Sequence, residues 1–459
     1  METEKNFIEC LVSIMLHSED NLTAEKNVYD AINSYATELL SKAFEKLDRS
    51  LVTKMSSKGY EIARKDSRRI QFMYGDVEFE RRLWKKGKNY SYALDEYLGF
   101  KPYVRYSPLT ISNMVQLSSK STYRICEQAV NILTPLNVSH TAIHNFTKMV
   151  GKNIESYKKY EDEYNLAEKR VVDTLYLEGD AVSIKHQNGK IMNLHRFQVH
   201  EGVVKVSNKS ICLNSQYFSS FSRKEAYEQA FTYLRNKYYL DKTTVISNSD
   251  GGSGYEPEVF KELALGCKRH EHFLDGYHRN KKIYDRTYFC PELIRPIQKA
   301  ISEHSKDSLK AVMDTMDSIA SIKDEEAIEN TKRLRAYIKR NWEYMKPFRL
   351  RNLGSISRHG LGVCESNHRP YTYRMKKQGR TWKEKGATAV VNVIDAIKNG
   401  YYQKAVNSNW KKEREKIGRK DLPLNFLPRL LSDRDSDHKG VRNGRIVPKY
   451  DQLGRRNMW

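Results

Sequence analysis

Hydrophobic residues near the N-terminus recur at helical spacing. Apolar positions such as Val28 and Ile32 follow the repeat of an amphipathic helix, so we predict helices there. The repeat then shortens to two residues over 70–79, which predicts a β-hairpin that turns at Gly75–Asp76. Residues 89–98 predict a further short strand or a loop, so this part of the chain is expected to be a small α+β module.

Three helices are predicted between residues 107 and 150. Ser107-Pro108 begins the first, Thr122 caps the second, Pro135–Asn137 breaks it, and Ser139 begins the third. The third helix carries His140, His144 and Lys148 at intervals of four residues, and therefore on one face. A short turn between two capped helices is typical of a DNA-binding helix-turn-helix, and an ordinary three-helix packing unit explains the same pattern equally well.

The middle of the chain alternates between strand and helix patterns. Strands are predicted at 175–184, 191–200, 203–213, 243–248 and 270–274, and helices at 152–169, 223–239, 256–265 and from 275 onward. Antiparallel strands followed by strands that alternate with helices predict a mixed sheet. Further helices are predicted throughout 291–348, at a turn from Glu365 that Pro370 should end or kink, and at 388–398.

The net charge of the chain indicates which kind of partner it binds. The chain has 80 Lys and Arg against 57 Asp and Glu, a net charge of +23, which predicts a polyanionic partner. An aromatic content of 11% argues against wholesale disorder. The absence of a signal peptide and of an apolar stretch of ~20 residues predicts a cytoplasmic protein without a membrane partner. The 6 cysteines are scattered and form no C-x-x-C pair, which argues against a zinc ribbon or a disulfide framework.

Two carboxylates occur within the first strand of the predicted sheet. Glu178 and Asp180 lie two residues apart and therefore share one face of the strand. Two ionised acids on a partly buried face raise the free energy of the folded state unless a cation or a partner compensates their charge. A solvated Asp at the end of a strand explains the same sequence equally well.

Two further acids follow later strands. Asp250 comes after the strand 244–248 in the sequence Ser-Asp-Gly-Gly-Ser-Gly, where glycine permits close approach of a ligand. Ordinary turn chemistry also explains these residues. Asp275 and His278 are three residues apart on one helical face, and an N-cap Asp beside a packed His is the alternative interpretation.

A glycine-rich loop at 354–362 leads to Glu365, and a basic, aromatic segment follows it. The candidate DNA-binding residues of this segment are Arg369, Arg374, Lys376, Lys377, Arg380 and Trp382. Such side chains bind phosphates and stack on bases, so the segment predicts contact with a nucleic acid strand.

The order of the acids suggests a metal site. Asp180, Asp250 and Glu365 could form a three-carboxylate site, and oxygen ligands of this kind suit Mg²⁺ or Mn²⁺. A pair of ions ~3.5–4 Å apart would clamp the attacking and leaving oxygens of a phosphodiester. Such chemistry needs no protein nucleophile, in agreement with the lack of a Cys-His or Ser-His motif.

These motifs together resemble a known family. The strings are Leu-Tyr-Leu-Glu-Gly-Asp, Ser-Asp-Gly-Gly, Phe-Leu-Asp-Gly-Tyr-His-Arg-Asn-Lys, Cys-Glu-Ser-Asn-His and Tyr-Arg-Met-Lys-Lys-Gln-Gly-Arg-Thr-Trp. In this order, over residues 65–405, they resemble the ISLre-type bacterial insertion-sequence transposases, whose members are often filed as an uncharacterised protein family. The resemblance implies a ribonuclease H-like core with a helical insertion and a DDE triad at Asp180, Asp250 and Glu365. The Asp275-x-x-His278 pair is similar to a signature of Mutator-like relatives.

We therefore predict a mixed α/β chain of four parts. These are an α+β module at 1–105, a helix-turn-helix-like region with a linker helix at 106–170, a ribonuclease H-like domain at 171–405 with an insertion at about 291–348, and a basic tail at 406–459. The predicted function is metal-dependent cleavage and strand transfer at the ends of an insertion sequence, by a homo-oligomer bound to double-stranded terminal repeats and target DNA at the nucleoid. The alternatives are a catalytically silent DNA-binding protein derived from such an element and a ribonuclease H-like nuclease without joining activity.

Overall fold

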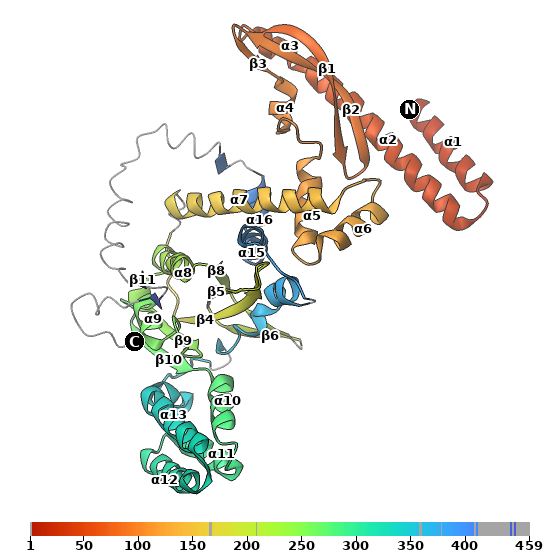
Figure 1. Cartoon of the computed structure of the whole chain (residues 1–459). Coiled ribbons are helices and arrows are strands. Elements are labelled where there is room, and N and C mark those ends of the chain that lie inside the picture. Colours follow the sequence, from red (N-terminus) through yellow and green to blue (C-terminus); the bar gives the residue numbers. More distant parts are fainter. Residues whose placement is uncertain are drawn as a thin grey trace. The chain divides into compact units, whose positions relative to one another are not determined.

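The computed structural model (Figure 1) describes residues 2–164, 168–207, 209–357, 360–377, 379–407, 410–411, 441–442 and 445–446. It divides into two compact units, Met1–Lys152 and Asn153–Trp459. No helix within the described residues is long and apolar enough to cross a membrane.

The first unit combines long helices with a small antiparallel sheet. Its elements are α1 (Glu2–His17), α2 (Asn21–Ser50), α3 (Val52–Ser56), β1 (Glu61–Phe72), β2 (Gly75–Lys86), β3 (Asn89–Ser91), α4 (Ala93–Leu98), α5 (Pro108–Ser118), α6 (Tyr123–Leu133) and the first part of α7 (His140–Tyr164). Every second residue of β2 is buried at its start, which turns Val77 and Phe79 toward Phe44 of α2. The predicted helices and hairpin are thus confirmed in this unit.

The turn of the hairpin lies two residues earlier than predicted. Phe72 pairs with Gly75, so Met73 and Tyr74 form the turn. Gly75 begins β2 with φ at 126°, and a Cβ atom there would lie 3.4 Å from Thr37 of α2. Glycine is therefore favoured at position 75 by its backbone angle and by its packing against α2, and it does not form the turn itself.

The three helices predicted between residues 107 and 150 are present. Ser107 and Thr122 cap α5 and α6 through their hydroxyls, and the Ser139 hydroxyl accepts from the backbone N–H of Ala142 at the start of α7. The expected linker helix is not a separate element, because α7 continues unbroken to Tyr164 and spans the boundary between the units.

The second unit is built on a five-stranded mixed sheet, as predicted. Its strands are β4 (Thr174–Lys185), β5 (Ile191–His200), β8 (Gln216–Ser220), β9 (Thr244–Ser249) and β10 (Arg269–Leu274), in the order β10-β9-β4-β5-β8. Strands β9 and β10 run parallel to β4, whereas β5 runs antiparallel to both β4 and β8. Helices α8 (Arg223–Lys237) and α9 (Pro257–Leu263) pack on one face, and α15 (Glu384–Lys398) packs on the other.

The strand predicted at 203–213 is wrong as a single element. It divides into β6 (Val203–Val206) and β7 (Lys209–Cys212), which pair with each other as a hairpin outside the main sheet. Ser207 adopts a left-handed φ of 54° at the bend. The edge strand β8 was not predicted, because five residues ending in two serines carry little strand signal.

Helices follow β10 in a separate cluster. These are α10 (Gly276–Arg286), α11 (Ile294–Glu303), α12 (Lys306–Lys323) and α13 (Glu325–Asn341), with short helical turns η1 (Leu240–Lys242), η2 (Pro291–Leu293), η3 (Glu343–Met345) and η4 (Phe348–Leu350) elsewhere in the unit. Their apolar faces meet around Ile283, Ile297, Met316 and Leu334. Figure 1 shows these helices grouped together beyond the β10 edge of the sheet, and the helices predicted over 291–348 are present.

The chain returns to the sheet through a short helical segment. It consists of η6 (Ser366–His368), α14 (Arg369–Tyr371) and the π-helical turn η7 (Thr372–Lys376); α16 (Tyr402–Val406), β11 (Val441–Arg442) and β12 (Arg445–Ile446) come later. Pro370 was predicted to end or kink this segment, and it does not end it, since the helical turns continue to Lys376. Pro370 lies in the first turn of α14, where its missing N–H is not needed. The predicted basic tail at 406–459 falls largely outside the described residues.

Candidate active site

Strand register brings three acids to one edge of the sheet. Glu178 of β4 pairs with Asn248 of β9, and Ser249 of β9 pairs with Leu274 of β10. The chain then continues to Asp250 on one strand and Asp275 on the other, while Asp180 lies two residues beyond Glu178. Because the carboxyl ends of β9 and β10 meet beside the middle of β4, Asp180, Asp250 and Asp275 lie at the same level of the sheet.

Asp180 is held by two hydrogen bonds. Its Oδ1 accepts from the backbone N–H of Ala181 at 2.7 Å, and its Oδ2 lies 2.9 Å from Nε2 of His368. Burial raises the pKa of Asp180, but the hydrogen bonds from His368 and from the backbone of Ala181 oppose burial, and the pKa lies below its ordinary value. The carboxylate is therefore ionised and fixed in direction.

A buried arginine determines which nitrogen of His368 carries the proton. Arg196 of β5 pairs with Asp180 across the sheet, is fully buried, and contacts Nδ1 of His368 through Nη1. A guanidinium can only donate, so Nδ1 accepts and Nε2 carries the hydrogen that is donated to Asp180. Burial also lowers the pKa of His368, in agreement with a neutral ring.

The Arg196–His368 pair continues into the core. The Arg196 guanidinium lies 4.1 Å from the centre of the Tyr371 ring, and the Tyr371 hydroxyl donates to Asp395 at 2.5 Å. Asp395 also accepts from the backbone N–H and the hydroxyl of Ser219. Neither Arg196 nor His368 was predicted to belong to the site; the Cys-Glu-Ser-Asn-His string and the two-residue period of β5 are the signals that could have indicated them.

Asp250 begins a tight turn at the end of β9. Its Oδ1 accepts from the backbone N–H of Gly252 at 2.8 Å, and Gly251 has a φ of 68° that favours glycine. The predicted turn is therefore present. The negative charge of Asp250 also acts on Lys282 of α10, where burial lowers the pKa of the ammonium and Asp250 opposes that shift.

Asp275 and His278 form the start of α10. The Oδ1 atom of Asp275 accepts from the backbone N–H of His278 at 2.9 Å and lies 2.9 Å from Nδ1 of the same residue. Asp275 is thus the helix N-cap, as the alternative interpretation held. The charge of His278 nevertheless contributes to the lowered pKa of Asp180, so the pair belongs to the same electrostatic environment.

Glu178 is a buried anchor for the loop that leads to Glu365. Its carboxylate accepts from the backbone N–H groups of Gly362, Val363 and Cys364, with the longest of these bonds at 3.3 Å. Burial raises the pKa of Glu178 to about 7, and the three backbone hydrogen bonds oppose that rise. Both oxygens are occupied, so this acid holds the loop in place.

Glu365 follows this anchored loop directly. Its side chain is exposed, and it precedes His368 by one helical turn. Its negative charge raises the pKa of His368 against the larger effect of burial, so the carboxylate acts on the ring that contacts Asp180.

The predicted metal ligands have the right chemistry but no closed arrangement. Within the described residues, no three His, Cys, Asp or Glu side chains gather closely enough to hold an ion. The acids at this edge supply carboxylate oxygens, the ligand type that Mg²⁺ and Mn²⁺ prefer. Asp180 accepts a hydrogen bond on each oxygen, from Ala181 and from His368, and Asp250 accepts one on Oδ1 from Gly252.

The basic segment divides into exposed and buried residues. Arg369, Lys376 and Lys377 are exposed. Arg374 and Trp382 are 2% and 7% exposed, and the Trp382 indole donates to the carbonyl of Met375. Both side chains are therefore buried and do not face a DNA strand as predicted: Trp382 packs in the core between β4 and α15, and the Arg374 guanidinium lies 4.8 Å from the centre of its ring.

The four other residues predicted to contact DNA lie in two parts of the chain. Arg380 is half-buried and donates to the backbone carbonyls of Tyr373 and Arg374. On α7, in the first unit, His140 lies 3.0 Å from Glu127, His144 packs edge-on against Tyr123, and Lys148 is exposed.

The chain is therefore a mixed α/β protein. Asp180, Asp250 and Asp275 form an acidic edge of its sheet, beside the buried pair of Arg196 and His368. A family model described as "Uncharacterised protein family (UPF0236)" matches residues 20–414, and the chain belongs to this family. The UPF0236 protein in the vanSb 3′ region of Streptococcus gallolyticus is 33% identical over 382 residues, which cover 83% of each chain.

More distant relatives come from Caldanaerobacter subterraneus subsp. tengcongensis. Its UPF0236 protein TTE2489 is 23% identical over 411 residues, which cover 87% of this chain and 84% of the relative. Another relative, 23% identical over 402 residues (86% of this chain and 81% of the relative), bears a name that joins eleven TTE labels.

Proposed function

We propose that this protein is a DDE transposase that cuts and joins DNA at the ends of an insertion sequence. The observation that carries the proposal is the meeting of Asp180 and Asp250 at one edge of a mixed sheet, with the Glu365–His368 turn returning to Asp180. The strand arrangement also supports it. A meander of β4, β5 and β8, with β9 and β10 parallel to β4 on its other side, is typical of ribonuclease H-like cores.

In this proposal Asp180, Asp250 and Glu365 are the acids that hold Mg²⁺ or Mn²⁺. A bound pair of ions would neutralise charge on the scissile phosphate and activate the attacking oxygen. The protein's own contribution is orientation, because Arg196 and His368 fix the direction of the Asp180 carboxylate. Asp275 and His278 would act as accessory residues at the same edge.

The reaction is a pair of displacements at phosphorus. Water attacks the phosphodiester and the P–O3′ bond breaks, which leaves a 3′-hydroxyl and a 5′-phosphate. That 3′-hydroxyl then attacks a phosphorus of the target strand, and the target's own 3′-oxygen leaves with a proton. No covalent bond to a protein side chain is needed.

The remaining residues would bind DNA. Exposed Arg369, Lys376 and Lys377 lie on the segment that follows Glu365 and suit phosphate contact. The helix-turn-helix-like α6–α7 pair, with His140, His144 and Lys148 on one face, would recognise the terminal repeats. Joining two ends requires two active sites or one used twice, so we expect a homo-oligomer on DNA at the nucleoid.

The relatives add one supporting observation. The name of one of them joins eleven labels from a single strain, which we interpret as one protein encoded at eleven places in that chromosome. Such copies are what a gene that moves itself would leave.

The experiment is cleavage and strand transfer of a labelled duplex that carries the terminal repeats, with Mg²⁺, Mn²⁺ or EDTA. We expect metal-dependent nicking at the element boundary and a joined product, both lost in Asp250→Asn while DNA affinity in EDTA is retained. Tight binding without cleavage would favour a silent DNA-binding protein. Cleavage without joining would favour a nuclease.

A further inference from the structure

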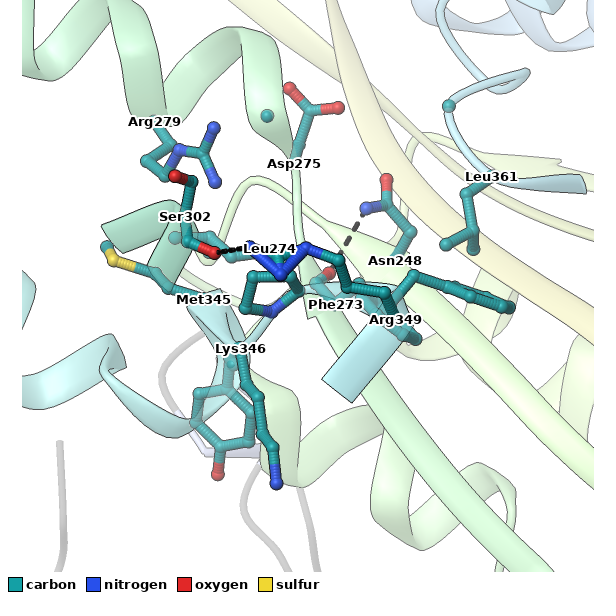
Figure 2. A pocket seen from close by; sticks show the side chains of 15 residues that line it. Asn248, Phe273, Leu274, Asp275, Arg279, Ser302, Met345, Lys346, Arg349 and Leu361 are labelled. Carbon is teal, nitrogen blue, oxygen red and sulfur yellow. Dashed lines mark hydrogen bonds between the residues drawn. The ribbon is translucent and has the colours of Figure 1, made fainter. Parts of the chain in front are cut away.

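A cavity of about 360 Å³ opens beside the proposed acidic edge (Figure 2). It lies at the carboxyl ends of β9 and β10, between the start of α10 and the turn at 344–349. Asn248 and Asp275 belong to its lining, and Asp250 follows β9 at the same edge. The cavity is therefore next to the acids proposed to cut DNA and does not contain them.

Arg351 fixes one wall of this cavity. Its Nη1 donates to Glu271 at 2.9 Å and to the carbonyl of His272 at 2.8 Å, and its Nε and Nη2 donate to the carbonyls of Lys346, Glu343 and Tyr344 at 3.0–3.1 Å. The guanidinium also lies 3.9 Å from the centre of the Phe273 ring. All of its N–H groups are used to tie the 343–346 turn to β10, so the wall is formed before any ligand binds.

The lining offers an aromatic surface and positive charge together. The half-buried Phe348 ring stacks on Phe273, with ring centres 5.3 Å apart and planes 20° apart. Arg279, Lys346 and Arg349 border the same space, and Arg349 reaches across it to the carbonyl of Ser302 (Figure 2). The side-chain N–H₂ of Asn248 donates to the carbonyl of Phe273, so its oxygen is the group that it can offer to a ligand.

We infer that this cavity receives one unpaired nucleotide of the DNA strand that is cut. The inference rests on the proposed function and specifies the form of its substrate. A ring for stacking, three cations for phosphate and an amide acceptor are the groups that bind a single nucleotide. The volume suits a small ligand and excludes a duplex, so the nucleotide must leave the base stack to enter.

The test uses the full chain in EDTA, where no cleavage takes place. Hairpin DNA carries 5-iododeoxyuridine either in a single-stranded overhang or at a paired position, and ultraviolet crosslinks are mapped by mass spectrometry. We expect crosslinks from the unpaired base to Tyr344 or Phe348, and few from the paired base. Equal crosslinking of the two bases, or crosslinks that map elsewhere, would overturn the inference.

Variants of Phe348 distinguish a loss of base stacking from a loss of the fold. Phe348→Ala should weaken binding of the overhang about 5- to 100-fold, the range for loss of a base stacked on an aromatic ring, whereas Phe348→Tyr should retain it. Lys339→Ala, an exposed lysine of α13 outside the cavity, is the matched control and should bind normally. Unchanged binding by a folded Phe348→Ala protein contradicts the inference.

The crosslinking result can be interpreted independently of the cleavage assay. Specific crosslinking without cleavage of terminal repeats would overturn the transposase proposal and leave a single-strand nucleotide pocket. Cleavage without crosslinking would overturn the pocket alone. Displacement of the overhang by inorganic phosphate at equal concentration would identify an anion site without base recognition and would also overturn the inference.

Discussion

His368 donates from Nε2 to Oδ2 of Asp180 across 2.9 Å, although the two residues are 188 positions apart in the chain. The hydrogen bond determines where the Asp180 carboxylate points. We expect His368→Ala to slow metal-dependent cleavage ~10- to 100-fold, the usual cost of losing a residue that orients a metal ligand. DNA affinity in EDTA should not change, because His368 is buried.

Single-turnover cleavage and a melting curve test this prediction together. His368→Gln, which keeps a donor, should recover part of the rate, and Ser366→Ala on the exposed side of the same turn should behave as wild type. A folded His368→Ala protein with the wild-type cleavage rate would remove the positioning role.

Two variants decide whether Glu365 or Asp275 is the third metal-binding acid beside Asp180 and Asp250. Asp275 caps α10, and Asn caps a helix about as well as Asp, so Asp275→Asn should lower the cleavage rate less than tenfold. Glu365 is exposed and precedes His368 by one turn, so Glu365→Gln should reduce the rate by at least ~10²-fold without changing the melting temperature. The reverse order of rates would assign the role to Asp275.

Glu178 should matter for stability because its buried carboxylate satisfies three backbone donors of the 362–364 loop. Glu178→Ala leaves these N–H groups unpaired, and we expect the free energy of unfolding to fall by ~2–5 kcal/mol. Glu178→Gln retains one acceptor and should cost less. The exposed Glu292→Ala is the control for urea denaturation, and equal stability of all three variants would contradict the anchoring role.

We expect the basic segment to contain two kinds of residue, those that stabilise the core and those that bind DNA. Trp382→Ala should lower the free energy of unfolding by ~3–5 kcal/mol, because the indole is buried among Val182, Ile184 and Met375. Lys376→Glu should leave stability unchanged, weaken DNA binding and flatten its dependence on salt by about one charge. Binding titrations at several salt concentrations check both, and a loss of affinity in a folded Trp382→Phe protein would restore the predicted DNA contact.

Periodicity predicted much of the fold because most strands and helices bury a face of their own. Strands β4 and β5 and the capped helices α5 and α6 were predictable on this ground. The division of 203–213 and the edge strand β8 were not, because their boundaries depend on pairing with distant residues.

The candidate site was predictable only in part. Asp180 and Asp250 stand out because acids within or after apolar strands are unusual. The burial of Trp382 and the link from Arg196 to His368 were not visible, since a basic aromatic segment has the same composition on a surface and in a core. Which side chains meet across 172 residues is a property of the packed sheet.

His200 should make the protein sensitive to acid. Its ring is fully buried beside Tyr176, with ring centres 5.0 Å apart, and burial lowers its pKa to about 4 from the ordinary 6.5. The folded protein therefore binds this proton more weakly than the unfolded chain does. The stability from neutral His200 is complete above pH 6.5 and is lost as the pH falls toward 4, with a slope of up to ~1.4 kcal/mol per pH unit for one proton. In His200→Phe, which keeps an aromatic ring against Tyr176, urea denaturation between pH 7 and pH 4.5 should show a shallower loss of stability, and parallel curves for the two proteins would contradict the assignment.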